Sequence, residues 1–324
     1  MEKEVVLGID IGGTNIRAGL VDKNNSLNSF ECMSSVNILN DDAVTNLIKF
    51  VEDYCMTNLD SFTIKAVSIG FPSTINKERT KLLSTPNIKG LDDIDIVEIM
   101  EYKLKIPVFI ERDVNMLFMF DSNYHKISSK GIVIGCYIGT GLGNAISING
   151  EIIVGKSGVA AELGHTPIMG RKQICSCGNE GCCEIWSSGK GLEKLSRDCF
   201  PDTDISDIFT KHSDEKNLED YIDILSIPIA TEINILDPDY VILGGGVVSM
   251  NDFPIMKLKS YILKHTRKPY PYTGLQLLYS PNSHENGVLG AGLYAFKKLG
   301  ILPDKKLNEI TLNLHRVEIS PISN

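Results

Sequence analysis

The 324-residue chain lacks any apolar run that approaches the roughly eighteen consecutive residues of a membrane-spanning helix. Positive charge is also scarce, because 32 lysines and arginines face 41 aspartates and glutamates, and the net charge of −9 argues against a nucleic-acid surface. No charged stretch followed by an apolar segment precedes Gly8, so we expect no secretory signal and a reducing, cytoplasmic setting. The absences predict a protein with neither membrane nor nucleic acid among its partners.

Long linkers, low-complexity segments and repeats of fixed period are missing as well. The hydrophobic content of 43% and the charged content of 23% are values of a globular protein. A chain of this length has enough residues for two domains, each with its own core.

Cysteine, in contrast, is concentrated in one short segment. Cys175, Cys177 and Cys182 lie within eight residues, and His165 is ten residues upstream of the first. Three thiolates and one imidazole form one of the usual tetrahedral ligand sets of structural zinc. Reduced core cysteines and a disulfide are the alternatives, and the neighbouring Cys183 leaves open which of the two adjacent thiols is the third ligand.

Glycine marks two similar segments in the two halves of the chain. Residues 4–21 predict two strands joined by a glycine hairpin. Asp10 stands at the end of an apolar strand, where Val or Ile is expected, so we expect this carboxylate to have a functional role. Residues 130–154 repeat the pattern of strand, glycine turn and strand, and Asn149 with Gly150 predicts a type I′ hairpin. We therefore expect two related α/β lobes with a cleft between them.

The remaining pattern is that of alternating helices and strands. We expect helices at 41–58, at 92–104 with Asp92 and Asp93 at its start, from 112 onward, and at 287–299, and strands at 66–71, 107–111 and 240–243.

Three glycine clusters follow predicted strands and are candidates for nucleotide binding. Glycine turns expose backbone N–H groups that hold phosphate oxygens, and threonine hydroxyls add donors. A third cluster after a strand allows a flat adenosine to approach the backbone closely. One such turn alone is more often structural, but three in this order favour a nucleotide. The candidates are Gly12, Gly13, Thr14, Gly139, Thr140, Gly141, Gly143, Gly244, Gly245 and Gly246.

Residues 150–157 match the Walker A spelling of a phosphate-binding loop. The four variable positions, however, have the pattern of a β-strand, and the first glycine belongs to the predicted hairpin. A true P-loop lies between a strand and a helix, so we interpret the match as accidental.

Together these motifs resemble the ROK (repressor, open reading frame, kinase) family of bacterial sugar kinases, over roughly residues 5–300. The resemblance rests on residues 10–14, 113–115, 139–143, 162–165, 244–246 and the Cys-x-Cys-Gly-x-x-Gly-Cys-x-Glu signature at 175–184. It implies a two-lobed actin/hexokinase-like ATPase fold, related to ribonuclease H. The lobes it implies are 1–113, completed by the helix at about 287–300, and 114–286, followed by an extension at 301–324.

The resemblance also implies an activity, the transfer of phosphate from ATP to the 6-hydroxyl of a sugar. Asp113 matches the catalytic base, and its alternative role is that of a helix N-cap. Asp10 matches a residue that holds Mg²⁺ through water, and Thr14 and Thr140 match phosphate contacts. A homodimer is the family expectation.

Sugar hydroxyls are implied to contact Asn87, Glu162, His165 and Glu184. The two assignments of His165 are compatible, because one ring nitrogen can bind zinc while the other reads a hydroxyl. The zinc is then structural.

The chain departs from the glucokinase pattern at Arg112, where those kinases carry Asn. That position matches a contact to the C3 and C4 side of the sugar, and the pattern looks most like D-allose kinases, allose being the C3 epimer of glucose. Glucokinase and N-acetylmannosamine or fructose kinase are the alternatives. Arg112 could instead face away and pair with Glu111 or Asp121.

Two other function classes remain. Sugar-responsive repressors of the family carry a helix-turn-helix domain before the core, whereas here the Asp10 strand begins at residue 5. A catalytically silent sugar-binding protein is disfavoured by Asp113.

Overall fold

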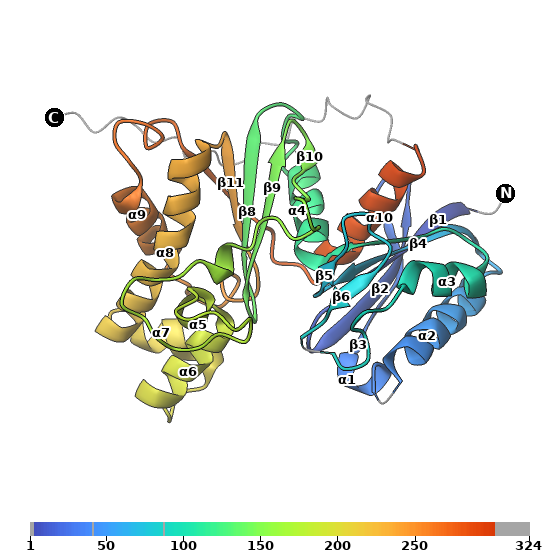
Figure 1. Ribbon diagram of the computed structural model, residues 1–324, viewed down its shortest axis with the longest axis horizontal. Coiled ribbons are helices and arrows are strands. Elements are labelled where there is room, and N and C mark those ends of the chain that lie inside the picture. The colour runs from blue at the N-terminus through green and yellow to red at the C-terminus, as the bar shows by residue number, and fades with distance from the viewer. Residues whose placement is uncertain (1–2, 41, 87, 302–324) are drawn as a thin grey trace.

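The computed structural model describes residues 3–40, 42–86 and 88–301, and its two five-stranded sheets have the same topology (Figure 1). The first sheet has the order β3-β2-β1-β4-β7, and the second has the order β10-β9-β8-β11-β12. In each, the first three strands are antiparallel and the last three are parallel. The expectation of two related lobes is confirmed.

The strands of the first lobe are β1 (Lys3–Ile11), β2 (Asn15–Asp22), β3 (Leu27–Ser34), β4 (Phe62–Phe71) and β7 (Val108–Arg112), with a small hairpin of β5 (Thr74–Ile75) and β6 (Leu82–Ser84). Those of the second are β8 (Ile132–Ile138), β9 (Leu142–Ile148), β10 (Glu151–Ile152), β11 (Tyr240–Gly244) and β12 (Gln276–Tyr279).

Helices cover both sheets. Those that follow the first-lobe strands are α1 (Ser35–Ile38), α2 (Ala43–Asn58) and α3 (Ile96–Leu104). The second lobe contains α5 (Glu184–Ser187), α6 (Gly189–Cys199), α7 (Ile208–His212), α8 (Lys216–Leu236) and α9 (Ile255–His265), with short 3₁₀ turns at Leu163–His165 and Ile205–Asp207. None of the described helices is both long and apolar enough to cross a bilayer.

Two helices connect the lobes. The first, α4 (Asp113–Tyr124), follows β7 and contacts both β4 and β9. The second, α10 (Asn286–Lys298), follows the last strand of the second lobe but packs on β1, β2 and β4 of the first. Because α4 touches both lobes, we keep the boundary between 113 and 114 as a proposal. Beyond Ile301, the expected extension lies outside the described residues.

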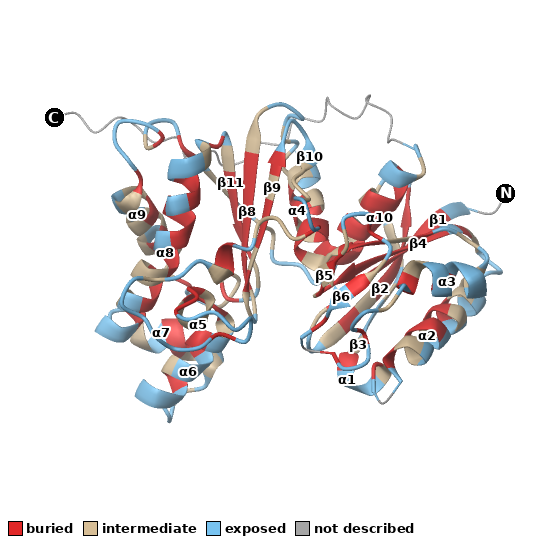
Figure 2. Cartoon of the chain, in the orientation of Figure 1, coloured by how far each residue is buried: buried red, intermediate tan, exposed pale blue. Residues whose placement is uncertain are grey.

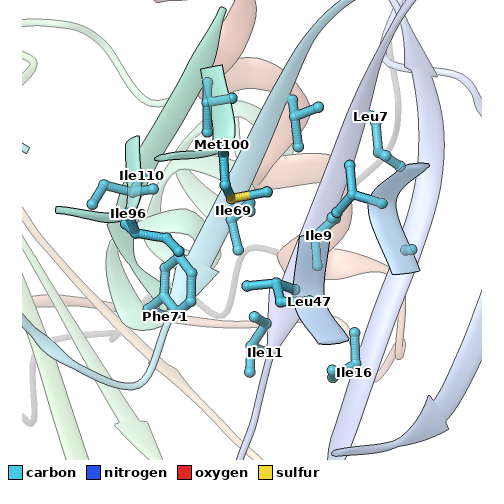
Figure 3. Packing of buried hydrophobic residues seen from close by; sticks show 14 of the residues in the cluster. Leu7, Ile9, Ile11, Ile16, Leu47, Ile69, Phe71, Ile96, Met100 and Ile110 are labelled. Carbon is cyan, nitrogen blue, oxygen red and sulfur yellow. The ribbon is translucent and has the colours of Figure 1, made fainter. Parts of the chain in front are cut away.

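Strand β1 is buried on both faces, which explains its nearly continuous apolar sequence. Leu7 and Ile9 lie in the cluster that also contains Leu47 of α2 and Met100 of α3 (Figure 3). Val6, on the opposite face, packs with residues of α10. Figure 2 shows the same concentration of buried residues along the central strands of both sheets.

One predicted boundary is wrong. The helix expected at 92–104 begins at Ile96. The carboxylate of Asp92 accepts a hydrogen bond from the backbone N of Thr85 at 2.6 Å, and Asp93 has a φ of 58°, in the left-handed region that no α-helix contains. Asp92 therefore stabilises the preceding loop, and Asp93 lies in a turn before the helix.

Candidate active site

A cleft of about 580 Å³ separates the lobes and is lined by both of them. It collects most of the residues singled out in the sequence. From the first lobe these are Asp10, Gly12, Gly13, Thr14, Arg112 and Asp113, and from the second Gly139, Thr140, Gly141, Gly143, Glu162, His165, Glu184, Gly245 and Gly246. Asn87 lies outside the described residues.

Asp10 is the penultimate residue of β1 and lies directly opposite Arg17 on β2. Arg17 Nη1 is 3.3 Å from Asp10 Oδ2. Burial raises the pKa of Asp10, and the nearby guanidinium acts in the opposite direction. At the start of α10, a Cβ on Gly287 would lie 2.5 Å from Asp10 Cγ, so only glycine allows the helix to approach this carboxylate. Arg17 also lines the cleft and had no role in the sequence analysis, although strand pairing across the hairpin places it there.

Asp113 is the first residue of α4, and Arg112 occupies the N-cap position. Asp113 therefore does not have the N-cap role that was its structural alternative. Burial, and secondarily the negative charge of Asp10, raise the pKa of Asp113 to about 7. A carboxyl group with such a pKa is suited to general base catalysis near neutral pH.

Arg112 extends across the cleft toward the second lobe. Its Nη1 donates to the carbonyl oxygen of Ala160 at 2.8 Å, and its Nη2 is 2.9 Å from Oε1 of Glu162. The alternative of an outward-facing side chain paired with Glu111 or Asp121 is wrong. The guanidinium instead pairs with a residue that was itself expected in the ligand site.

The expected metal ligands come together in one cluster. The ligand atoms of His165, Cys175, Cys177 and Cys182 all lie within 4.8 Å of one another. The Sγ atoms of Cys177 and Cys182 are 3.6 Å apart, and Sγ of Cys175 is 3.7 Å from Nδ1 of His165. Because a tetrahedron with 2.3 Å metal–sulfur bonds has edges of about 3.8 Å, this geometry fits zinc.

The ambiguity between the two adjacent cysteines is resolved by their directions. Cys182 lies in the cluster, whereas Sγ of Cys183 lies 3.2 Å from the carbonyl oxygen of Leu163 and 3.3 Å from that of Gly164. Cys183 is fully buried, and burial raises the pKa of its thiol. It is a core residue of the second lobe.

His165 joins the cysteine cluster to the cleft. Its Nδ1 faces Cys175, and its Nε2 lies 3.6 Å from Oε2 of Glu162. Glu184 is close to His165 and to Cys175. Its Oε1 is 3.8 Å from Nδ1 of His165 and 3.5 Å from Sγ of Cys175. A metal on Nδ1 would leave Nε2 free to donate to a ligand in the cleft.

Five glycines of the clusters fall into two groups. A Cβ on Gly139 or Gly246 would meet no described atom within 4 Å, so these two leave open backbone at the cleft. A Cβ on Gly143 would lie 2.3 Å from Cγ1 of Val114, and one on Gly244 would lie 2.7 Å from Cβ of Ser280. Gly245 has a φ of +96° and would collide with the backbone of Ile138. Packing of strands and helices therefore accounts for this second group.

The segment with the Walker A spelling is a hairpin, as expected. Asn149 and Gly150 have φ values of 52° and 80°, and they join β9 to β10. The residues after β10, from 153 to 162, are not helical, so the segment lacks the helix of a P-loop.

Comparison with known proteins gives consistent matches over most of the chain. The model of the ROK family matches residues 6–298. A glucokinase from Thermotoga maritima is 22% identical over 320 residues, which cover 93% of this chain and 100% of the relative. An N-acetyl-D-glucosamine kinase from Histophilus somni is 29% identical over 268 residues, 74% of this chain and 83% of the relative.

The crystal structure of a ROK family glucokinase from Streptomyces griseus, in complex with glucose and AMPPNP, matches with a TM-score of 0.74 and 23% identity. The match covers 89% of this chain and 98% of that one. It supports the expected two-lobed actin/hexokinase-like fold.

Proposed function

The chain belongs to the ROK family, and from that premise we propose that it transfers the γ-phosphoryl group of ATP to the 6-hydroxyl of a hexose. The observation that carries the proposal is Asp113, a carboxyl group with a pKa of about 7 in the cleft between the lobes. The glucokinase and the N-acetyl-D-glucosamine kinase among the relatives support a sugar as the acceptor.

Asp113 accepts the proton of the sugar hydroxyl as that hydroxyl attacks the γ-phosphorus. Phosphoryl transfer requires mainly positioning and neutralisation of charge, so one carboxylate and correctly placed phosphate ligands suffice. We assign the phosphate contacts to the turns around Gly12 and Gly139, with hydroxyl donors from Thr14 and Thr140.

The third glycine cluster is assigned to the adenosine. Gly246 leaves open backbone at the cleft, so a flat base can approach it closely. Gly244 and Gly245 support this turn by allowing it to pack against Ser280 and Ile138.

Two metal ions complete the proposed site. Asp10 offers carboxylate oxygens at the end of β1, which is the ligand type Mg²⁺ prefers, and Mg²⁺ supplies neutralisation of the phosphate charge when bound. The Cys₃His cluster fits structural Zn²⁺, with all four positions filled by protein ligands. His165 would hold the zinc through Nδ1, which would leave its Nε2 to donate to a sugar hydroxyl.

For the sugar itself we propose D-allose. Glu162, His165 and Glu184 line one wall of the cleft and are assigned to sugar hydroxyls, as is Asn87 by its motif. Arg112 comes from the first lobe and lines the same cleft, and we assign it to the C3 and C4 side of the sugar. Its guanidinium, paired with Glu162, stands where the glucokinase pattern has asparagine. Glucose, N-acetylmannosamine and fructose are the competing acceptors.

The test of the catalytic assignment is Asp113→Asn. Loss of the general base should reduce kcat by a factor of about 10² to 10⁴, while the Kd for the sugar stays within about threefold of wild type. The matched control is Asp198→Asn, because Asp198 is exposed and its carboxylate lies 3.6 Å from Nζ of Lys194 on the same helix. Turnover near that of wild type in Asp113→Asn would remove this residue from the mechanism. Sedimentation of the same preparations tests the proposed homodimer.

A further inference from the structure

Two arginines of the first lobe hold one irregular segment of the second, residues 158–162, which we call the interlobe segment. Arg79, in the loop between β5 and β6, donates from Nη1 to the carbonyl oxygen of Gly158 at 2.9 Å. Arg112 donates to the carbonyl oxygen of Ala160, two residues later. A Cβ on Gly158 would lie 2.2 Å from the carbonyl oxygen of Ile75, so the backbones themselves are in contact.

The backbone conformation of Arg79 indicates that its side chain has a structural role. Its φ is +58°, in the left-handed region, which is unfavourable for a residue other than glycine. The side chain is nevertheless buried, and Nη1 also donates to the carbonyl oxygens of Ile75 and Asn76 at 3.2 and 3.1 Å. Glycine would suit the turn better, and the contacts of the guanidinium offset the strain.

Glu111 links Arg79 to the catalytic end of the cleft. It is almost fully buried, and its carboxylate lies 2.9 Å from Nε of Arg79. The same carboxylate accepts hydrogen bonds from the backbone N of Arg112 at 2.9 Å and from Nδ2 of Asn115 at 3.0 Å. These donors flank Asp113, so one buried ion pair connects the interlobe segment with the junction of β7 and α4.

We propose that Arg79 is a positioning residue, which fastens the interlobe segment to the first lobe and so fixes Glu162 relative to Asp113. Glu162 is the last residue of the segment, and it is also held by Arg112. The fastening then holds the sugar-contacting groups of the two lobes in one arrangement. The expected effect on sugar binding rests on the proposed function. The attachment of the interlobe segment by Arg79 does not depend on it.

The test uses the double variant Arg79→Gly, Glu111→Gln. Glycine relieves the backbone strain, and glutamine avoids an unpaired buried carboxylate while its amide oxygen still accepts from Arg112. The matched control is Lys81→Met in the same loop, where Lys81 pairs with the exposed Asp93. We measure hydrogen exchange of peptides that cover residues 155–165, and KM for sugar and for ATP separately.

We expect exchange in the interlobe segment to become about 10-fold faster or more in the double variant, because a buried charge-assisted contact is lost. The KM for sugar should rise by about 10- to 100-fold, and the KM for ATP should stay within about twofold. Lys81→Met should change neither. Faster exchange in a protein whose wild type phosphorylates no hexose would support the fastening and contradict only the proposed function.

Unchanged exchange at 158–162 would overturn the proposal. It would also be overturned by an equal rise of both KM values together with a lowered melting temperature, because that pattern marks general destabilisation.

Discussion

The pKa of Asp113 leads to a quantitative prediction for the pH dependence of catalysis. A general base accepts a proton only when it is ionised, so activity is present above its pKa and is lost as pH falls through it. With a pKa of about 7, roughly one tenth of Asp113 is ionised at pH 6 and nine tenths at pH 8. We therefore expect kcat/KM to rise about tenfold between these values, with a midpoint near 7.

Direct chromatographic quantitation of ADP is the appropriate assay, since coupling enzymes titrate in the same range. The negative charge of Asp10 contributes to the raised pKa, so Asp10→Asn should shift the midpoint to lower pH. The measured quantity is the midpoint pH of the profile and not its maximum, because loss of the proposed Mg²⁺ ligand also lowers the maximum kcat/KM. The control Asp198→Asn should leave the midpoint in place. A flat profile between pH 5.5 and 8, or a midpoint near 4, would refute the reasoning from burial.

Three further predictions concern metal, specificity and motion. Purified protein should contain about one zinc per chain, and Cys177→Ser should lose zinc and sugar affinity together; active enzyme without zinc would refute the ligand set. Arg112→Asn should shift the ratio of kcat/KM for allose over glucose toward glucose by about 5- to 150-fold, the effect of mispairing one buried polar contact. An unchanged ratio with lowered stability would leave its ion pair with Glu162 purely structural. Small-angle scattering should show compaction on sugar binding, because closure excludes water from the transferred phosphate, and identical profiles at saturation would contradict it.

Local signals in the sequence predicted much of the fold. The glycine hairpins and the Asn149-Gly150 turn need only backbone conformations that glycine and asparagine favour, and both were found where expected. The cysteine cluster is similarly local, since its three thiols lie within eight residues. The helix start predicted at Asp92 and Asp93 is wrong, because acidic residues occur in loops as well as at helix starts.

Contacts between segments far apart in the chain could not be predicted from the sequence. Arg112 and Glu162 are fifty residues apart and meet only because the second lobe returns to the first. The hydrogen bond from Arg79 to Gly158 joins residues 79 positions apart, and its acceptor is a backbone carbonyl. Because every residue has such a carbonyl, the sequence does not indicate which one accepts the bond. The assignment of single residues to the cleft was therefore possible from motifs, whereas their pairing required the three-dimensional arrangement.

The most direct test of the proposed kinase is a panel of hexoses with ATP and Mg²⁺, in zinc-replete protein. Allose, glucose, fructose, N-acetylmannosamine and N-acetylglucosamine are compared by ADP release, and phosphorus NMR locates the phosphate. We predict phosphorylation at the 6-hydroxyl of at least one of these sugars, with allose preferred, and its loss in Asp113→Asn. ADP release that no hexose raises above the rate of ATP hydrolysis would contradict the account.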